Sequence, residues 1–292
     1  MKRRMKWMFV AWLVVLGLFL HGQEAWDNAE ELYPGFKHIF QERKEPRIMK
    51  INVIRIDLTT PGLYFEATPR APEWGTKMEP VEGQREMIIR TVRRKTRDFL
   101  TDARSEGHNM LVAANCNGWE PWCPPWNQKH GCNLGLIVSD GVLVSELNRC
   151  PSFVVYKDGR ITMEVVKQEA IDQIHLAVTG FAKILEDGNN VAGDKSKHPR
   201  MGYGLSKDCK YMYIMAIDGR QPGYSEGATT IELAEYLSEF GAWNALNMDG
   251  GGSTTLVSWD EKAKAIRKFN HHKGNVERTV GANLGICVKQ AK

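Results

Sequence analysis

The sequence predicts an α+β (mixed α/β) fold with largely antiparallel sheets and a small number of helices. Three observations point to it. Short runs of β-branched and aromatic residues recur along the chain, Asp-Gly turns separate several of them, and two longer segments carry a helical apolar pattern. A chain of 292 residues without a Pro-, Ser- or Gly-rich linker favours one large domain over two small ones.

Residues 1–22 have the features of a secretory signal peptide. Four basic residues among the first six precede the uncharged apolar stretch 7–20, and the polar Gln23 and Glu24 follow soon after. This stretch is shorter than the ~20 apolar residues that a membrane helix needs. We therefore expect cleavage near Gly22, no stable membrane anchor afterwards, and an exported protein that is periplasmic or secreted.

Removal of the signal peptide changes the charge balance. The full chain has 39 Lys and Arg against 35 Asp and Glu, and residues 1–22 contain four of the bases and none of the acids, which leaves 35 of each. A formally neutral protein has no general electrostatic attraction for nucleic acid. We therefore expect no nucleic-acid partner.

The predicted domain, 48–292, follows an N-terminal segment, 23–47, that we expect to be irregular. Two strands, 48–58 and 63–67, are split by Thr60-Pro61-Gly62 and are interpreted as a hairpin. Further strands are predicted at 110–114, 134–139, 153–157, 161–166, 211–217 and 281–288. Turn sequences at 139–141, 157–159 and 206–208 predict antiparallel neighbours.

The clearest helix is predicted over 230–240. Its apolar side chains recur at i, i+3, i+4 and i+7, as Leu233, Tyr236, Leu237 and Phe240. Thr229 and Glu232 have the spacing of a capping box, and Gly241 suits the left-handed position that follows a helix. We interpret the apolar stripe as an ordinary core face.

A second helical segment, 96–107, looks like a copy of this unit. It ends at Gly107 and leads into an apolar run that closes on Asn115. Aligning Gly107 with Gly241 places Asn115 on Asp249, which suggests two pseudo-repeated helix-strand-turn units, related by a pseudo-twofold axis, whose turns face one cleft. Chance similarity between two common patterns is the alternative.

The cysteine content suggests disulfides. An even number of cysteines, six, in an exported chain permits them, and Cys123 and Cys132 are the preferred pair because they bracket a loop rich in Pro and Trp. No CxxC or HxxxH spacing points to zinc. We expect no cofactor, with a divalent cation held by Asp218 and Asp249 as the alternative.

The run Asn247-Met248-Asp249-Gly250-Gly251-Gly252-Ser253 is the strongest candidate for a functional site. Three consecutive glycines remove every side chain from a turn, so backbone N–H groups can contact an anion or a sugar hydroxyl. Asp249 precedes them at the end of an apolar strand, where a carboxylate is partly shielded. The run is not a P-loop, since no Gly-Lys-Ser/Thr follows.

Together with six further blocks, this run resembles the phosphodiester glycosidase family. The blocks lie at 113–118, 138–141, 198–204, 217–221, 230–241, 244–253 and 277–280, within roughly residues 48–288. The chain departs from the family after Trp119, where Glu120 replaces a second aromatic residue and an insertion carries Trp122 and Trp126. These three Trp side chains are either a sugar-stacking platform or are packed under the loop.

The resemblance implies a hydrolase that cuts the bond between the anomeric carbon of a sugar and a phosphate oxygen, releasing free sugar and a phosphomonoester. The substrate would be a carbohydrate phosphodiester. Asp249 is assigned as the carboxylate that acts at the anomeric carbon, with Asp218 or Glu226 as the second acid/base or orienting group. For Asp218 a turn-forming role, and for Glu226 a solvated loop position, are the alternatives.

Arg200 and Arg278 are expected to clamp the phosphate, because arginine is permanently charged and bidentate. Further substrate contacts are expected from Asn115, Asn117, Gly118, Asn247, Gly250, Gly251, Gly252 and Ser253. His198 is interpreted as structural. The rival functions are a non-catalytic glycan binder and a metal-dependent phosphodiesterase that cuts on the phosphorus side.

Overall fold

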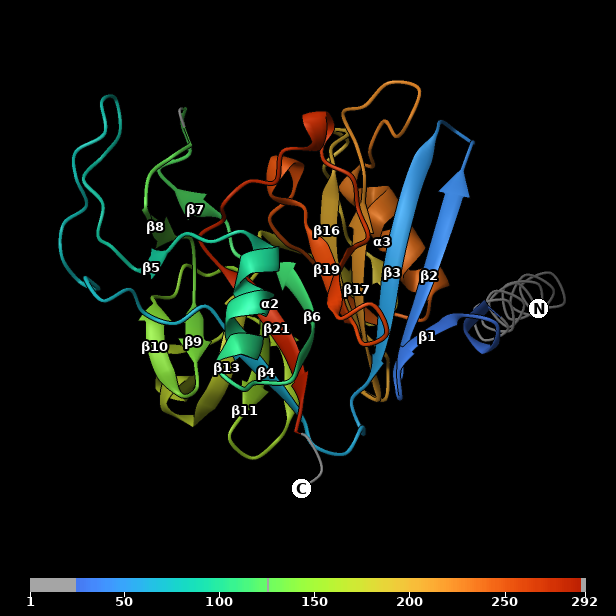
Figure 1. Ribbon diagram of the computed structural model, residues 1–292, viewed down its shortest axis with the longest axis horizontal. Helices are drawn as coiled ribbons and strands as arrows, with labels where there is room; N and C mark the ends of the chain where they lie inside the picture. Colours follow the sequence, from blue (N-terminus) through green and yellow to red (C-terminus); the bar gives the residue numbers. More distant parts are fainter. Residues whose placement is uncertain (1–24, 125, 290–292) are drawn as a thin grey trace, which may run out of the picture.

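The computed structural model describes residues 25–124 and 126–289 (Figure 1). The predicted signal peptide lies outside these residues. Within them, no helix combines the length and the apolar character needed to cross a membrane.

Antiparallel β-structure dominates the described residues, as predicted, and every pairing between named strands is antiparallel. The largest sheet has eight strands in the order β1 (Glu30–Tyr33), β2 (Phe36–Arg43), β3 (Met49–Asp57), β17 (Tyr211–Ile217), β16 (Arg200–Leu205), β18 (Asn244–Asn247), β14 (Ala182–Glu186) and β15 (Asn189–Asn190).

Three smaller sheets complete the β-structure. One runs β20 (Ala265–Lys268), β19 (Leu256–Asp260), β6 (Met110–Asn115), β21 (Asn283–Val288) and β4 (Leu63–Ala67). Another runs β10 (Val142–Ser145), β9 (Ile137–Ser139), β13 (Ile174–Thr179), β11 (Ser152–Tyr156) and β12 (Ile161–Glu164). The third runs β5 (Thr91–Val92), β8 (His130–Asn133) and β7 (Trp119–Glu120).

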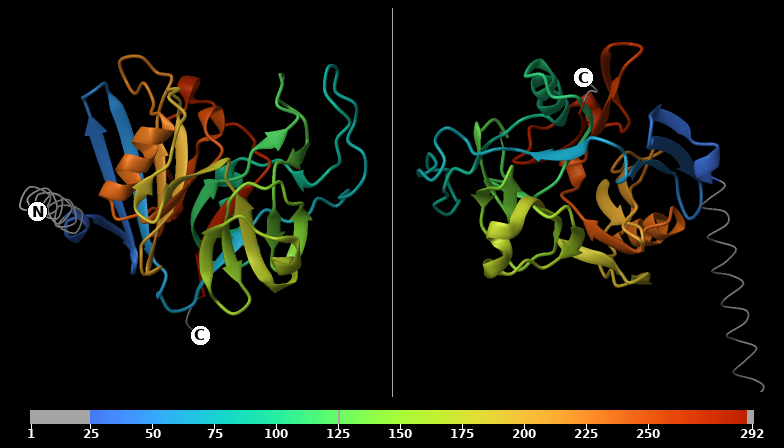
Figure 2. Two further views of the ribbon diagram at one scale, coloured as in Figure 1. Left: turned by 180° about the vertical axis from the view of Figure 1, so that it is seen from behind. Right: turned by 90° about the horizontal axis from the view of Figure 1, so that it is seen from below.

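Two α-helices lie wholly within the described residues, each against one sheet, and Figures 1 and 2 show them on outer faces. Helix α2 (Thr96–Ser105) packs on β6, and helix α3 (Thr230–Glu239) packs on the eight-stranded sheet. The predicted capping box of Thr229 and Glu232 is present. In β16, a Cβ on Gly202 would lie 2.9 Å from Leu237 Cδ1, so the missing side chain lets α3 approach closely.

The main core lies between the sheets. Strand β17 shows how the alternation of a strand serves two cores: Met212 and Ile214 belong to the cluster shared with the other sheets, whereas Tyr213 and Met215 belong to the cluster under α3. Both faces of the strand are buried, which explains its continuous apolar run.

Two predictions about the N-terminal part are wrong. Segment 23–47 is not irregular, because it contains β1 and β2, and β2 pairs with β3 along its whole length. Strands β3 and β4 do not form a hairpin: β3 pairs with β2 and β17, and β4 pairs with β21 in another sheet. Residues 60–62 therefore connect two sheets, and burial of β3 on both faces outweighs the local turn signal.

The remaining predicted strands are confirmed to within a few residues, and the predicted turns join β9 to β10, β11 to β12 and β16 to β17 as antiparallel pairs. The predicted disulfide is not formed. All six cysteines are free thiols, and Cys132 instead lies in β8 opposite Glu120.

Candidate active site

The turns after β6 and β18 meet, as the two-unit interpretation predicted. The Asn115 side-chain amide donates to the Asp249 carbonyl oxygen (2.7 Å), and the Asp249 backbone N–H donates to the Cys116 carbonyl oxygen (2.9 Å). The two strands belong to different sheets. The contact joins those sheets at one point, and the pseudo-twofold relation itself stays a prediction.

The glycine loop, residues 249–253, makes room for two arginines. A Cβ on Gly252 would lie 2.8 Å from Arg278 Nη2, and a Cβ on Gly251 would lie 3.2 Å from Arg220 Nη1. Gly251 also has a φ of +61°, in the left-handed region that favours glycine. The glycines are therefore needed so that two guanidinium groups can lie directly on the loop.

Two cavities share this loop. The first, of about 360 Å³, contains Asp249 and is also lined by Gly118, Trp119, Glu120, Trp122, Leu134, Phe181, His198, Pro199, Arg200, Arg220, Asn247, Met248, Gly250, Gly251, Gly252 and Arg278. The second, of about 510 Å³, shares Pro199, Arg220, Gly251, Gly252 and Arg278 with the first. An anion bound to both arginines would contact both cavities.

Burial perturbs the Asp249 carboxyl. The residue is partly exposed in the first cavity, and desolvation raises its pKa to about 7. Ser253, Arg278, the backbone of Gly250 and Trp119 act against this shift. The Ser253 hydroxyl and the Trp119 indole N–H lie close enough to influence the carboxyl. Both groups are buried, and neither has a hydrogen-bond partner with good geometry among the described residues. They can bond to a bound ligand.

The two arginines on the loop lack a carboxylate partner. Among the described residues, neither Arg220 nor Arg278 forms an ion pair within 4.0 Å, whereas fifteen other arginine and lysine side chains do so. Desolvation and the nearby Arg220 charge lower the pKa of Arg278, although Asp249 raises it. The Arg278 guanidinium lies over the Trp126 ring, 4.4 Å from its centroid. Two guanidinium groups without a carboxylate partner therefore line one cavity, where they are available to bind an anion.

Arg200, the other predicted clamp, is already satisfied. Its Nε donates to the Ala228 carbonyl oxygen (2.9 Å), and its Nη2 donates to Asp194 (2.8 Å) and to the Ser196 carbonyl oxygen (2.6 Å). The side chain is buried in the wall of the cavity. The structure thus ties Arg200 into the loop that precedes β16, whereas Arg220 is the arginine that lies against Gly251.

Asp218 and Glu226 line neither cavity. Burial raises the pKa of Asp218 to about 7, and its Oδ1 accepts from the His271 backbone N–H (2.8 Å). This bond fixes the loop that borders the second cavity. Glu226 acts through its backbone: its carbonyl oxygen accepts from the Arg220 N–H (3.3 Å). Both predicted acids support the site from outside it.

The predicted amides divide in the same way. Asn247 lines the first cavity and its Oδ1 is buried without a partner. Asn115 and Asn117 are fully used in the structure: Asn115 Oδ1 accepts from the Thr255 N–H (2.9 Å), and Asn117 binds the backbone of Leu134 (3.0 Å) and Thr179 (2.9 Å). A Cβ on Gly118 would lie 2.6 Å from Phe181 Cζ, so this glycine admits an aromatic ring to the cavity wall.

Sequence reasoning missed Arg220, Phe181 and the contact of His198 with Arg220. The signal for Arg220 was available, because it follows Asp218-Gly219 in one of the matched blocks. Of the three tryptophans in and before the insertion, Trp119 is buried and Trp122 is 61% exposed at the cavity. Packing under the loop therefore holds for Trp119, and Trp122 keeps an accessible ring.

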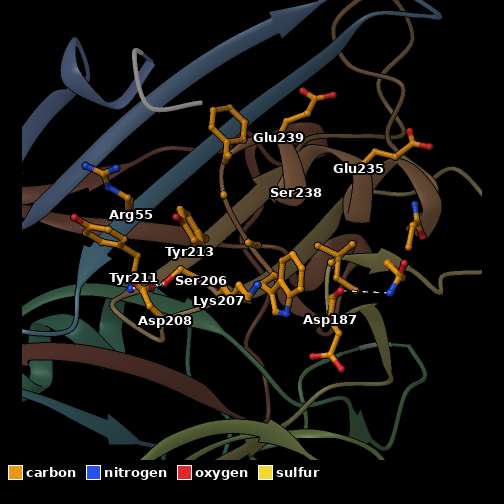
Figure 3. A pocket seen from close by; sticks show the side chains of 18 of the residues that line it. Arg55, Asp187, Ser206, Lys207, Asp208, Tyr211, Tyr213, Glu235, Ser238 and Glu239 are labelled. Atoms are coloured by element: carbon orange, nitrogen blue, oxygen red, sulfur yellow. Dashed lines mark hydrogen bonds between the residues drawn. The ribbon is translucent and has the colours of Figure 1, made fainter. Parts of the chain in front are cut away.

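A cavity larger than these two lies elsewhere. Figure 3 shows this space of about 1030 Å³, lined by residues from β3, β17 and the end of α3, such as Arg55, Tyr213 and Glu239. It contains none of the predicted site residues. The chemistry of the glycine loop, rather than cavity size, thus identifies the candidate site. Within the described ranges, no group of three or more His, Cys, Asp or Glu side chains is arranged to hold a metal ion.

A known family matches a stretch of the chain that includes the glycine loop. The family described as Phosphodiester glycosidase matches residues 124–287, more than half of the chain. The chain belongs to the phosphodiester glycosidase family. The match includes β18, the glycine loop and both loop arginines, whereas Asn115 to Gly118 precede it.

Solved structures extend the phosphodiester glycosidase likeness to the fold of most of the chain. The catalytic domain of the zebrafish N-acetylglucosamine-1-phosphodiester alpha-N-acetylglucosaminidase, auto-inhibited by its pro-peptide, is similar over 90% of this chain and 87% of that chain, with a TM-score of 0.59 and 16% identity. A hypothetical protein from Synechocystis is similar over 88% and 62% respectively, with a TM-score of 0.56 and 13% identity.

One curated relative is similar in sequence. The SPbeta prophage-derived uncharacterized protein YomE of Bacillus subtilis (strain 168) is 26% identical over 195 residues. The match covers 60% of this chain but only 28% of the relative, so the chain spans less than a third of that protein.

Proposed function

We propose that this protein hydrolyses the glycosidic bond of a sugar that is linked through its anomeric carbon to a phosphodiester. The bond from the anomeric carbon to the phosphate oxygen breaks, the oxygen of water bonds to that carbon, and the products are free sugar and a phosphomonoester. Family membership supports a glycosidase in general, and the geometry of the loop supports the finer reaction.

The observation that carries the proposal is the pair of unpaired arginines on the glycine loop. Arg220 and Arg278 repel each other and desolvation disfavours the charge on Arg278, yet no described carboxylate lies within ion-pair distance of either. An anionic group of the substrate would supply the missing countercharge. A phosphate would bind there directly beside Asp249.

This arrangement needs only one carboxylate in the cavity. The second pKa of a phosphomonoester is ~6, so the phosphate leaves without a strong general acid when arginines stabilise its charge. Asp249 is then left to stabilise the anomeric carbon or to activate water. The position of Asp218 and Glu226 outside the cavities fits this division of roles.

The two cavities suggest how the substrate lies. We place the sugar in the first cavity, where Asp249, Asn247 and Trp122 surround it, and the alcohol that leaves with the phosphate in the second. The phosphate would then sit against the shared wall of Arg220 and Arg278. As further parts of the proposal, the enzyme is exported after signal-peptide cleavage and acts on carbohydrate phosphodiesters rather than nucleic acid.

Product analysis tests the proposed reaction. The purified protein is incubated with a panel of sugar phosphodiesters and nucleotide sugars, with and without EDTA. Release of reducing sugar and phosphomonoester is the expected result. Sugar 1-phosphate would instead identify cleavage on the phosphorus side, and binding without products would identify a glycan binder.

A further inference from the structure

His198 is the one described side chain that holds the Arg220 guanidinium through hydrogen bonds. Arg220 donates to His198 Nδ1 from Nη2 (3.0 Å) and from Nε (3.3 Å). The acceptor role requires the neutral imidazole with its proton on Nε2. Both side chains line the first cavity. Two donors of one guanidinium thus converge on one ring nitrogen.

Two hydrogen bonds and two close backbone contacts hold the backbone of His198 in place. Its N–H and carbonyl oxygen both bond to Ala228, at 3.1 Å and 3.0 Å. A Cβ on Gly227 would lie 2.7 Å from the His198 carbonyl carbon, and one on Gly219 would lie 2.9 Å from the same atom. The two glycines therefore allow neighbouring chain segments to approach the His198 backbone closely.

Arg220 itself is held in an uncommon conformation. Its φ is 58°, a left-handed value that is unfavourable for a non-glycine residue. Its backbone N–H bonds to Glu226, and its guanidinium lies against Gly251. A strained backbone at Arg220 and hydrogen bonds to His198 together hold this guanidinium against the glycine loop.

We propose that His198 is a positioning residue, which holds Arg220 in the orientation that binds the phosphate of the substrate. This inference rests on the proposed function. His198 acts on the phosphate through Arg220, so its loss should impair a substrate with a phosphate more than one without it.

Three histidine variants and two substrates test this role. His198→Ala removes the acceptor, and His198→Asn keeps an acceptor oxygen near the position of Nδ1. His108→Ala is the control, because His108 is half exposed, pairs with Glu66 and lines neither cavity. The substrates are a sugar phosphodiester and an activated aryl glycoside of the same sugar.

We expect His198→Ala to lower kcat/KM on the phosphodiester at least ~10-fold and to change it less than ~3-fold on the aryl glycoside. His198→Asn should restore most of the phosphodiester rate, and His108→Ala should resemble the wild type. In an Arg220→Ala background, His198→Ala should cause no further loss. Equal losses on both substrates, no rescue by Asn, or additive losses would each overturn the positioning role.

Binding of inorganic phosphate by calorimetry separates this inference from the proposed reaction. If the wild type turns over neither substrate, the proposed function fails, and phosphate affinity still decides the role of His198. A weakening of at least ~10-fold in His198→Ala with recovery in His198→Asn supports it. Unchanged phosphate affinity in His198→Ala overturns it.

Discussion

Replacement of Asp249 by Asn should make the protein more stable and nearly inactive. Desolvation raises the pKa of Asp249 from 3.8 to about 7, so the fold opposes ionisation of this carboxyl. The free energy of unfolding therefore falls as pH increases from about 4 to about 7, because the carboxyl ionises at a lower pH in the unfolded chain than in the folded protein. Each unit of pKa shift corresponds to ~1.4 kcal/mol, so the full shift would lower the free energy of unfolding by about 4 kcal/mol at pH 8.

Residual contact with solvent and the lost attraction to Arg278 reduce that value, so we expect about 1–4 kcal/mol. The Asn variant should therefore melt several degrees above the wild type at pH 8, at about 2–4 °C for each kcal/mol. The two proteins should differ little at pH 4. Turnover of a sugar phosphodiester should fall at least ~100-fold, because Asn cannot act as a base or stabilise positive charge at the anomeric carbon.

Asp218→Asn is the matched control. Burial raises the pKa of Asp218 to about 7 as well, but the residue lines neither cavity. Its Asn variant should gain stability at pH 8 and keep activity within ~10-fold of the wild type. The reasoning is refuted if Asp249→Asn retains near-normal kcat, if it melts lower at pH 8, or if both variants lose activity to the same extent.

Three further predictions follow from the loop and its arginines. Arg278→Lys keeps the charge but loses the bidentate fork, so it should impair a sugar phosphodiester clearly more than an aryl glycoside of the same sugar; equal losses would remove Arg278 from phosphate recognition. Arg200→Lys should mainly destabilise the protein, by about 1–3 kcal/mol in urea unfolding, because it breaks buried hydrogen bonds outside the clamp, and a selective loss on the phosphodiester would contradict this. Gly252→Ala should lower phosphodiester turnover at least ~10-fold by displacing Arg278, while Gly193→Ala, where a Cβ meets no atom within 4 Å, should leave it unchanged.

The sequence predicted those parts of the fold and site that depend on local chemistry. Helix α3 has a periodic apolar face and a capping box, and the glycine run has a preceding apolar strand, so both were recognisable without tertiary information. The hairpin of β3 and β4 was wrong because strand partners are chosen by burial on both faces, which no local turn signal records.

The assignment of the arginines shows the same limit. Arg200 and Arg220 both lie within matched blocks, and their sequence neighbourhoods do not reveal which one is neutralised by an acid. The structure separates them through Asp194, which pairs with Arg200 and leaves Arg220 unpaired among the described residues. Asp218 is likewise an acid within a matched block, which made it a candidate for the second catalytic acid. Its carboxyl instead accepts a hydrogen bond from the His271 backbone N–H.

The assembly of the site from strands of separate sheets has a consequence for how the protein folds. The loop that carries Asp249 bonds to residues at the end of β6, more than a hundred positions earlier in the chain, and β17 pairs along its length with β3. Such contacts close long loops, and folding slows as the sequence separation of contacts grows. The glycine loop should therefore be among the last parts to become protected from hydrogen exchange during refolding. A fragment limited to 124–287 would expose the edges of β17, β19 and β21, and we expect it to aggregate rather than retain part of the activity.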